Sequence, residues 1–448
     1  MASFAADAVR PEIYQHFVRP TPAWFKESGL GIFIHWGAYS VPAWAEPIGE
    51  LGTIPKSYWF PHNPYAEWYY NTIRIDGSPA QRHHREVYGG APYDDFLDAW
   101  SAESFDPTGM ATLFRRCGAG FVIPTTKHHD GIALWDAPGT NGRNTVHRGP
   151  KRDLIGDLAA ATRAAGLRFG VYYSCGLDWH AAPTPPIVDE GAGFFEPDDE
   201  AYAGYVYRHV MDLIDRYRPD ILWGDIGYPA AGILAGPNSL VHLLDRFYRE
   251  SPAGVVNDRW GLTHWDFRTS EYQQGLELQG REMWQTCRGI GYSFGYNQLE
   301  DDRHYLDAPA AIKELVDVVA RGGNLLLNVG PDAAGRIPEP QRRCLEGMAT
   351  WMAVNAPAVQ AASPVDAAVA QHSDKPWTRW TQGGGYLYGV VDATATVDLP
   401  CHVDAVDLGS AASPDGAGLA AHVTDAGIRV RLPTTSAGAP AVVRFRLR

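Results

Sequence analysis

The sequence contains few cysteines and lacks a long apolar run. The five cysteines are scattered and odd in number, and no two have the CxxC spacing of a metal site, so we expect neither a disulfide framework nor a cysteine-based zinc site. No span of about 18 apolar residues occurs, which excludes a transmembrane helix of the usual length. The cysteines are Cys117, Cys175, Cys287, Cys344 and Cys401.

An excess of basic residues is also missing. The 448 residues include 38 Lys and Arg against 52 Asp and Glu, which gives a net charge of −14 at pH 7. Binding to nucleic acid needs a basic surface that neutralises phosphates, and no polybasic patch of the kind that binds membranes occurs. We therefore expect neither a nucleic-acid partner nor a membrane partner.

The first residues carry no sign of a secretion signal. Residues 1–10 lack the basic end and the apolar core that are typical of signal peptides. The sequence therefore predicts a cytoplasmic protein.

What the chain does contain, up to about residue 355, is an alternation of strand and helix patterns. Short apolar runs predict buried strands, and apolar residues at helical spacing predict helices between them. The predicted strands are 31–34, 121–126, 168–171, 221–223, 254–256 and 323–328, and the predicted helices are 110–117, 155–162, 206–217 and 312–319. Asp307 is the predicted N-cap of the last helix, and Gly166 the predicted stop of the second. Strands separated by helices favour a parallel sheet, and this many units favour a (β/α)8-like, TIM-type barrel.

The pattern changes beyond about residue 360. Short strands are predicted at 386–391, 394–399, 428–432 and 442–447, and the last two alternate apolar and basic residues as half-buried antiparallel strands do. Residues 409–420, rich in Ala, Gly and Pro, are predicted to be a loop. We expect an α/β catalytic barrel over residues 1–358, followed by a small antiparallel β-sandwich over residues 359–448.

Polar and aromatic side chains follow the predicted strands. The clearest case is the run Ile221-Leu-Trp223, which ends on Asp225 inside a Gly- and Pro-rich turn. In a β/α barrel, catalytic residues lie at the carboxyl ends of the strands. The residues at the strand ends are His35, His128, His129, Tyr172, Trp223, Asp225, Arg259 and Glu271.

This set of side chains is typical of a sugar site. Cleavage of a glycosidic bond needs two carboxyl groups, for which Asp225 and Glu271 are the candidates. Histidines and an arginine can bind sugar hydroxyls, and aromatic rings can stack on the sugar. Alternatively, Asp225 is a structural acid that caps its loop, and Glu271 is a surface acid.

A metal site is a further interpretation. His128 and His129 could be ligands, as in metal-dependent barrel hydrolases. No His-x-His occurs on the first strand, however, and adjacent residues on a strand point to opposite faces. The sequence therefore favours a site without a metal.

At this point the motifs identify a family. The chain resembles the α-L-fucosidases of glycoside hydrolase family 29 from about Trp24 to Pro331, with several long motifs in the family's order. The motifs are residues 24–37, 125–131, 151–153, 170–174, 222–225, 257–259 and 323–331.

The resemblance implies a (β/α)8-like catalytic domain, a following β-sandwich, and a retaining mechanism that releases L-fucose from fucosylated glycans without a cofactor or a metal. It implies that Asp225 is the nucleophile and Glu271 the general acid/base. The fucose-binding positions that it implies are His35, Glu67, Trp68, His128, His129, Tyr172, Trp223, Arg259 and Phe294.

Two segments depart from the family's pattern. Related enzymes often have Trp and Glu together where this chain has Trp284-Gln285, which predicts an altered rim of the site and makes Glu282 a rival acid/base. Residues 176–200 look peculiar to this chain and are predicted to shape the leaving-group site.

Other functions use the same residues. A transfucosidase, a hydrolase of related L-galactosides, and a non-catalytic fucose-binding protein stay open as alternatives. A homo-oligomer would be compatible with the sequence, which carries no specific sign of one.

Overall fold

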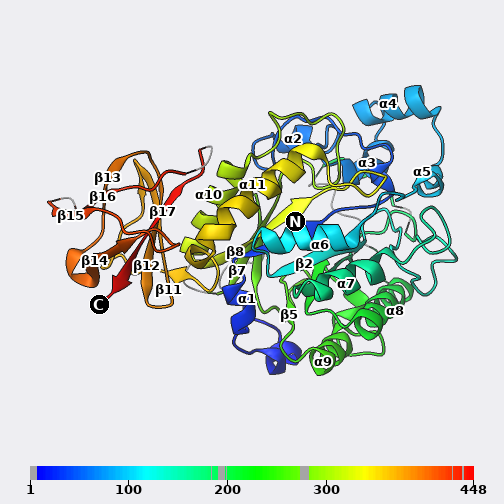
Figure 1. Ribbon diagram of the computed structural model, residues 1–448. Helices are drawn as coiled ribbons and strands as arrows, with labels where there is room; N and C mark the ends of the chain where they lie inside the picture. Colours follow the sequence, from blue (N-terminus) through cyan, green and yellow to red (C-terminus); the bar gives the residue numbers. More distant parts are fainter. Residues whose placement is uncertain are drawn as a thin grey trace.

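The computed structural model describes residues 8–448 except 183, 190–196, 198, 273–281, 426 and 436–437. A curled parallel sheet with surrounding helices forms one part of the molecule, and antiparallel strands form the other (Figure 1). Helices α10 (Ala308–Ala320) and α11 (Glu339–Asn355) lie between the two parts. The expected fold class, a (β/α)8-like barrel followed by antiparallel sheets, is confirmed.

Within the described residues, eight parallel strands form the curled sheet, in the order β5-β4-β3-β2-β1-β8-β7-β6. Their bounds are β1 (Leu30–Ile34), β2 (Phe121–Lys127), β3 (Arg168–Ser174), β4 (Ile221–Asp225), β5 (Val255–Val256), β6 (Arg268–Glu271), β7 (Trp284–Gly289) and β8 (Gly323–Val329). The six predicted strands correspond to β1–β5 and β8. Strands β6 and β7 were not predicted, because neither contains an uninterrupted apolar run.

Both faces of the sheet are buried along β1, β4 and β5, and these strands are largely apolar rather than alternating, whereas β6 is polar. In β1, Ile32 and Ile34 pack outward against the helices, whereas Phe33 points into the barrel. The side chains inside the barrel form an interior cluster, which includes Phe33, Phe121, Ile123, Tyr172, Ile221, Trp223, Phe294 and Leu326.

The two edges of the curled sheet, β5 and β6, meet through one parallel bridge among the described residues, between Asn257 and Phe267. The Asn257 side chain joins the end of β5 to β4: its amide accepts a hydrogen bond from the Gly224 N–H and donates one to the Gly224 carbonyl, both at 2.9 Å. Next to the bridge, the Asp266 N–H donates to the Val256 carbonyl at 2.8 Å. The Asp258 carboxylate accepts hydrogen bonds from the Thr269 N–H at 3.0 Å and from Arg268 Nε at 2.9 Å. The Asn-Asp-Arg segment therefore closes the barrel where the backbone ladder is shortest.

Helices connect the strands, and several begin at an aspartate. Asp307 accepts a hydrogen bond from the Ala310 N–H, as predicted, and Asp153 does the same for Gly156; such a cap contributes about 1 kcal/mol. Gly166 has φ +76° after the second predicted helix, which a glycine adopts without strain.

The other α-helices are α1 (Ala23–Glu27), α2 (Lys56–Trp59), α3 (Tyr69–Thr72), α4 (Pro79–Tyr88), α5 (Asp94–Ala99), α6 (Pro107–Arg116), α7 (Leu154–Ala164), α8 (Glu200–Tyr217) and α9 (Leu240–Glu250). Short 3-10 helices are η1 (Glu12–Phe17), η2 (Ala38–Ser40), η3 (Ala66–Trp68), η4 (Ala230–Gly232), η6 (Ala356–Ala358) and η7 (Val403–Ala405).

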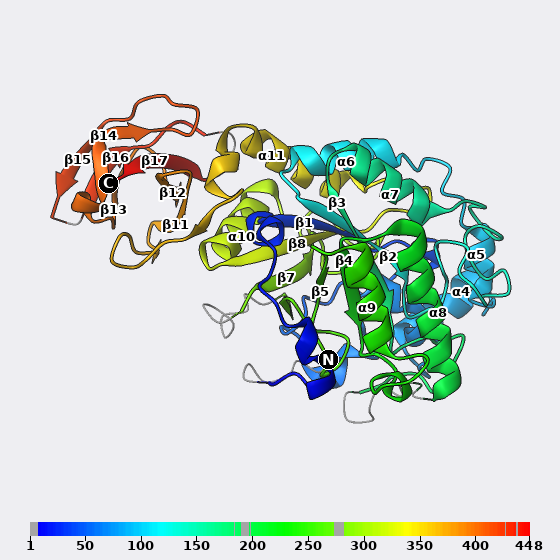
Figure 2. The same cartoon turned by 90° about the horizontal axis from the view of Figure 1, so that it is seen from below.

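Seen from below, α8 and α9 run beside each other along the barrel, far from the C-terminal strands (Figure 2). Across the described residues, every helix is too short or too polar to span a membrane.

The C-terminal part contains two antiparallel sheets. One has the order β10-β11-β12-β17-β14, with β9 added beside β11, and the other has the order β13-β16-β15. The strands are β9 (Ser363–Pro364), β10 (Ser373–Asp374), β11 (Trp377–Gly383), β12 (Tyr386–Asp392), β13 (Thr396–Leu399), β14 (Val406–Ala412), β15 (Ala421–Thr424), β16 (Gly427–Arg431) and β17 (Ala441–Leu447). The domain boundary predicted after residue 358 falls between η6 and β9 and stays a prediction.

The prediction of a loop over residues 409–420 is wrong at its start. Residues 409–412 belong to β14, which pairs with β17 through an irregular register between Asp407 and Ala412. Small residues are typical of loops, but they are also found where a strand is bulged.

Candidate active site

A pocket of about 330 Å³ opens at the carboxyl ends of the parallel strands. Every residue that the sequence analysis assigned to the site lines this one pocket. They are His35, Glu67, Trp68, His128, His129, Tyr172, Trp223, Asp225, Arg259, Glu271 and Phe294.

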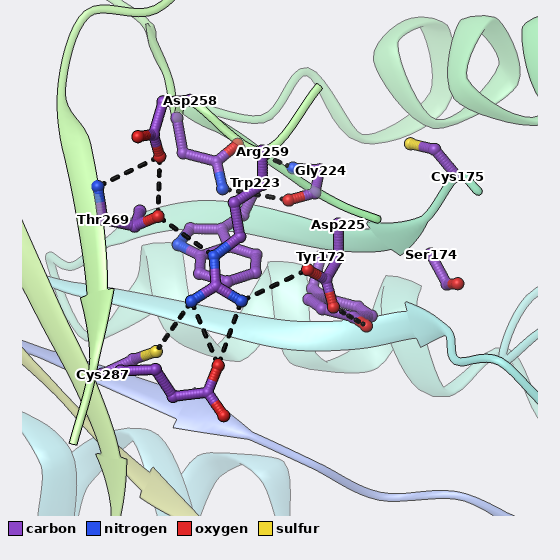
Figure 3. Close-up of polar contacts among 12 residues, drawn as sticks. Tyr172, Ser174, Cys175, Trp223, Gly224, Asp225, Asp258, Arg259, Thr269 and Cys287 are labelled. Atoms are coloured by element: carbon purple, nitrogen blue, oxygen red, sulfur yellow. Dashed lines mark hydrogen bonds and ion pairs between the residues drawn. The ribbon is translucent and has the colours of Figure 1, made fainter. Parts of the chain in front are cut away.

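Arg259 contacts both candidate catalytic carboxylates, and Figure 3 shows its contact with Asp225. Its Nη1 donates to Asp225 Oδ1 at 3.3 Å and to Glu271 Oε2 at 3.1 Å, and its Nη2 also donates to Glu271 Oε2 at 3.1 Å. Burial alone would lower the pKa of Arg259, but Glu271 and Asp225 raise it above its ordinary value. The guanidinium therefore stays charged and holds the two acids close together.

Each carboxylate also accepts a hydrogen bond from a tyrosine. The Tyr172 hydroxyl donates to Asp225 Oδ2 at 2.9 Å, and the Tyr65 hydroxyl donates to Glu271 Oε1 at 2.9 Å. Each of the four carboxylate oxygens of Asp225 and Glu271 therefore accepts a hydrogen bond, which fixes both side chains. The sequence analysis did not single out Tyr65, although it lies two residues before Glu67.

His35 presents an acceptor to the pocket. Burial lowers its pKa to about 3, so the ring is neutral. The Asn328 amide donates to the Phe294 carbonyl at 2.7 Å, so its oxygen faces His35 Nδ1, also at 2.7 Å. Nδ1 therefore carries the proton, and Nε2 is left as the acceptor.

His129 has the same tautomer for a similar reason. The Ser174 hydroxyl donates to the Leu177 carbonyl at 2.8 Å and therefore accepts from His129 Nδ1, at 2.7 Å. Burial lowers the pKa of His129 to about 4 and that of His128 well below its ordinary value. His128 Nδ1 is buried and has no hydrogen-bond partner among the described residues.

His128 and His129 were predicted to point to opposite faces of a strand. That prediction is wrong, because β2 ends at Lys127 and both histidines follow it. The fully buried Lys127 ammonium donates to Asp178 Oδ2 at 3.0 Å, and the Trp179 N–H donates to the His129 carbonyl at 2.8 Å. These contacts turn the chain so that both rings line the pocket. Among the described residues, no group of three or more His, Cys, Asp or Glu side chains is arranged to hold a metal ion.

Glu67, on η3, is 1% exposed. Its Oε2 accepts hydrogen bonds from the Gly295 N–H at 2.7 Å and from the Ser293 hydroxyl at 3.3 Å. Burial raises the pKa of Glu67 to about 7. Near neutral pH this carboxyl is therefore partly protonated and can donate a hydrogen bond through Oε1.

The raised pKa of Glu67 predicts a pH-dependent stability. The folded state keeps a proton that the unfolded chain releases above its ordinary pKa of 4.5. Stability is therefore full below about pH 4.5 and falls as the pH rises to about 7, by about 3 kcal/mol. In Glu67→Gln this loss should disappear, so the free energy of unfolding, measured with urea, should fall less between pH 5 and pH 8 than in the wild type.

The matched control for that measurement is Glu339→Gln, which removes an exposed carboxylate. It should keep the pH dependence of the wild type. Equal pH dependence in the wild type and in Glu67→Gln would contradict the predicted burial of a proton at Glu67.

Trp284-Gln285, where this chain differs from the family's usual Trp and Glu, lies beneath the pocket and not at its rim. Gln285 is fully buried; its Oε1 accepts from Trp223 Nε1 at 3.0 Å and its Nε2 donates to Asn324 at 3.0 Å. Glu282 lies before the start of β7 and does not line the pocket. It accepts from Trp265 Nε1 at 3.2 Å and pairs with Arg10 at 3.5 Å.

Five apolar residues that line the pocket were not predicted. Four lie between β1 and α3, and the fifth follows Asp225. Their segments have no regular apolar period, so no pattern indicated them. They are Leu51, Ile54, Trp59, Phe60 and Ile226. Of the segment 176–200, residues 183, 190–196 and 198 lie outside the described residues, and Trp179 packs against Trp68 and His129.

Known proteins resemble this chain in sequence and in fold. The family model for α-L-fucosidases matches residues 2–357. An α-L-fucosidase from Dictyostelium discoideum is 31% identical over 359 residues, covering 77% of this chain and 73% of that protein. The tissue α-L-fucosidase of Homo sapiens is 31% identical over 382 residues, covering 83% of this chain and 76% of that protein.

The crystal structure of Thermotoga maritima α-fucosidase in complex with fucose is similar with a TM-score of 0.83. The two sequences are 40% identical, and the match covers 95% of this chain and 97% of that one. The chain therefore belongs to the α-L-fucosidase family of glycoside hydrolases.

Proposed function

We propose that the protein is a retaining exo-α-L-fucosidase, which removes terminal α-L-fucosyl groups from oligosaccharides or glycoconjugates through a covalent glycosyl–enzyme. The observation that carries the proposal is that Asp225 and Glu271 share one nitrogen of Arg259. One oxygen of each carboxylate therefore lies within hydrogen-bond distance of the same nitrogen. Such a close pair supports the retaining arrangement, in which the two carboxyl groups are about 5–5.5 Å apart.

In the proposed reaction, an Asp225 oxygen attacks the anomeric carbon while the bond from that carbon to the leaving oxygen breaks. Glu271 in its protonated form gives its proton to that leaving oxygen. Glu271 then takes a proton from an incoming water, whose oxygen displaces Asp225 and releases fucose. Arg259 and the two tyrosines hold the carboxylates in place throughout.

The pocket offers suitable contacts for the sugar. His35 Nε2 can accept from a hydroxyl, and the His128 ring and the carboxyl of Glu67 line the same pocket. Phe294 and Trp223 are apolar surfaces for the methyl group of a 6-deoxy sugar, where a hydroxyl would be left without a partner. The Thermotoga maritima relative forms a complex with fucose, which supports fucose as the sugar.

The test is the release of 4-nitrophenol from 4-nitrophenyl α-L-fucoside, with and without EDTA. We expect turnover that EDTA leaves unchanged. Loss of activity in EDTA would instead favour a metal-dependent hydrolase. A folded protein that turns over neither this substrate nor a panel of fucosylated glycans would contradict the proposal and favour a binding function.

The retaining mechanism has its own measurement. Proton NMR of the first product should detect the α-anomer of L-fucose before it equilibrates in water. Initial formation of the β-anomer would show inversion and would rule out Asp225 as a nucleophile.

A further inference from the structure

The residue that follows each candidate catalytic carboxylate has a left-handed backbone. Ile226 has φ +65° and Tyr272 has φ +53°. Only a few per cent of non-glycine residues adopt positive φ, and a β-branched residue there is an outlier. The positive φ of Tyr272 is explained by its side chain, since the hydroxyl donates to the Tyr292 carbonyl at 2.8 Å. Ile226 has no polar side-chain atom that could offset the strain.

Surrounding hydrogen bonds impose this conformation on the turn. The Asp225 carbonyl accepts from the N–H groups of Cys175 at 3.0 Å and Gly176 at 3.4 Å, and the Gly227 N–H donates to the Arg259 carbonyl at 2.9 Å. A Cβ atom at Gly176 would lie 2.2 Å from the Ile226 carbonyl oxygen, so the two loops approach closely. Glycine would fit this turn without strain. The isoleucine side chain must therefore contribute through what it contacts.

Its contacts lie at the opening of the pocket. Ile226 is half-buried, lines the pocket and packs against the interior cluster. Leu51 and Ile54 line the same pocket and are also half-buried. The groups assigned to the sugar, such as His35 and Glu67, are buried. Three half-buried apolar side chains thus line the more exposed part of the pocket, together with the exposed Lys56, whereas the groups assigned to the sugar are buried.

We propose that Ile226, together with Leu51 and Ile54, forms a leaving-group subsite that selects aglycones with an apolar face, such as an aryl group or the C–H face of a second sugar. The proposal rests on the proposed fucosidase function. Ile226 adjoins Asp225, so its side chain is placed beside the reacting bond, and the strained turn fixes its direction.

The test compares two substrates that differ in their leaving group. 4-Nitrophenyl α-L-fucoside carries an aryl face, whereas α-L-fucosyl fluoride releases a single ion with no face to contact. In Ile226→Gly, we expect the ratio of kcat/KM for the aryl fucoside to that for the fluoride to fall about tenfold from its wild-type value. The intrinsic reactivities of the two substrates cancel in this comparison. Ile226→Asn tolerates the same backbone and should lower the ratio in the same direction.

The matched control is Ala395→Gly, at φ +67° and remote from the pocket, which relieves similar strain and should keep the wild-type ratio. A ratio that stays unchanged in both Ile226 variants would overturn the proposal, even if both rates fall together. If the wild type turns over neither substrate, the fucosidase function itself fails, and the subsite fails with it.

Discussion

Asp225→Ala should lower kcat for 4-nitrophenyl α-L-fucoside by at least about 100-fold while the protein stays folded. Asp225 is 7% exposed and receives hydrogen bonds on both oxygens, from Tyr172 and Arg259. Only Glu67 and Glu271 join it as carboxylates among the described lining residues, and neither ends the same strand. Without the nucleophile the covalent intermediate cannot form.

The fold should survive this substitution because the strand end is held by its main chain. The Asp225 carbonyl accepts the Cys175 and Gly176 N–H groups, and alanine keeps that carbonyl. The thermal midpoint should therefore change little. The matched control is Asp220→Asn, just before the same strand, where the carboxylate pairs with Arg168 on the far side of the barrel from the pocket. It should retain activity near that of the wild type; wild-type rates in Asp225→Ala would refute the role of Asp225.

Glu271→Ala should produce a loss that depends on the leaving group. General acid catalysis contributes roughly 100- to 10,000-fold, and it matters most when the leaving oxygen is a poor leaving group, as in a natural glycan. We expect a loss in that range for a fucosyl disaccharide and a much smaller loss in the first step for fucosyl fluoride, which needs no proton. The measurement is kcat/KM for both substrates.

Azide provides a second readout for Glu271. Turnover of the glycosyl–enzyme by water needs a general base, whereas anionic azide does not. Added azide should therefore restore turnover in Glu271→Ala and yield α-L-fucosyl azide. Glu282→Ala is the control, and it should behave like the wild type. A leaving-group-dependent loss in Glu282→Ala, or equal losses for both substrates in Glu271→Ala without azide rescue, would assign the acid/base role elsewhere.

The sequence alone predicted some parts of this molecule because their cause is local. Strands β1 to β5 and β8 are apolar runs that end at polar residues, so Asp225 could be placed at a strand end from the sequence. Asp307 caps its helix through a contact three residues away. Such features depend on neighbours in the chain.

Other parts depend on contacts between distant residues. Strand β6 is polar along its whole length, and the position of Glu271 depends on its contacts with Arg259 and Tyr65. The sequence alone therefore left Glu271 open as either a catalytic carboxyl or a surface acid. The shared direction of His128 and His129 depends on the buried pair of Lys127 and Asp178. Neither arrangement leaves a periodic pattern in the sequence.

The closure of the barrel has a mechanical consequence. The curled sheet is closed at one seam, where the backbone bridge between Asn257 and Phe267 is joined by contacts of the Asp258 and Arg259 side chains with Thr269. Asp225 lies on one side of that seam and Glu271 on the other. The distance between the two acids therefore depends on the contacts at this seam. A substitution that weakened these contacts would change the reaction rate before it unfolded the protein.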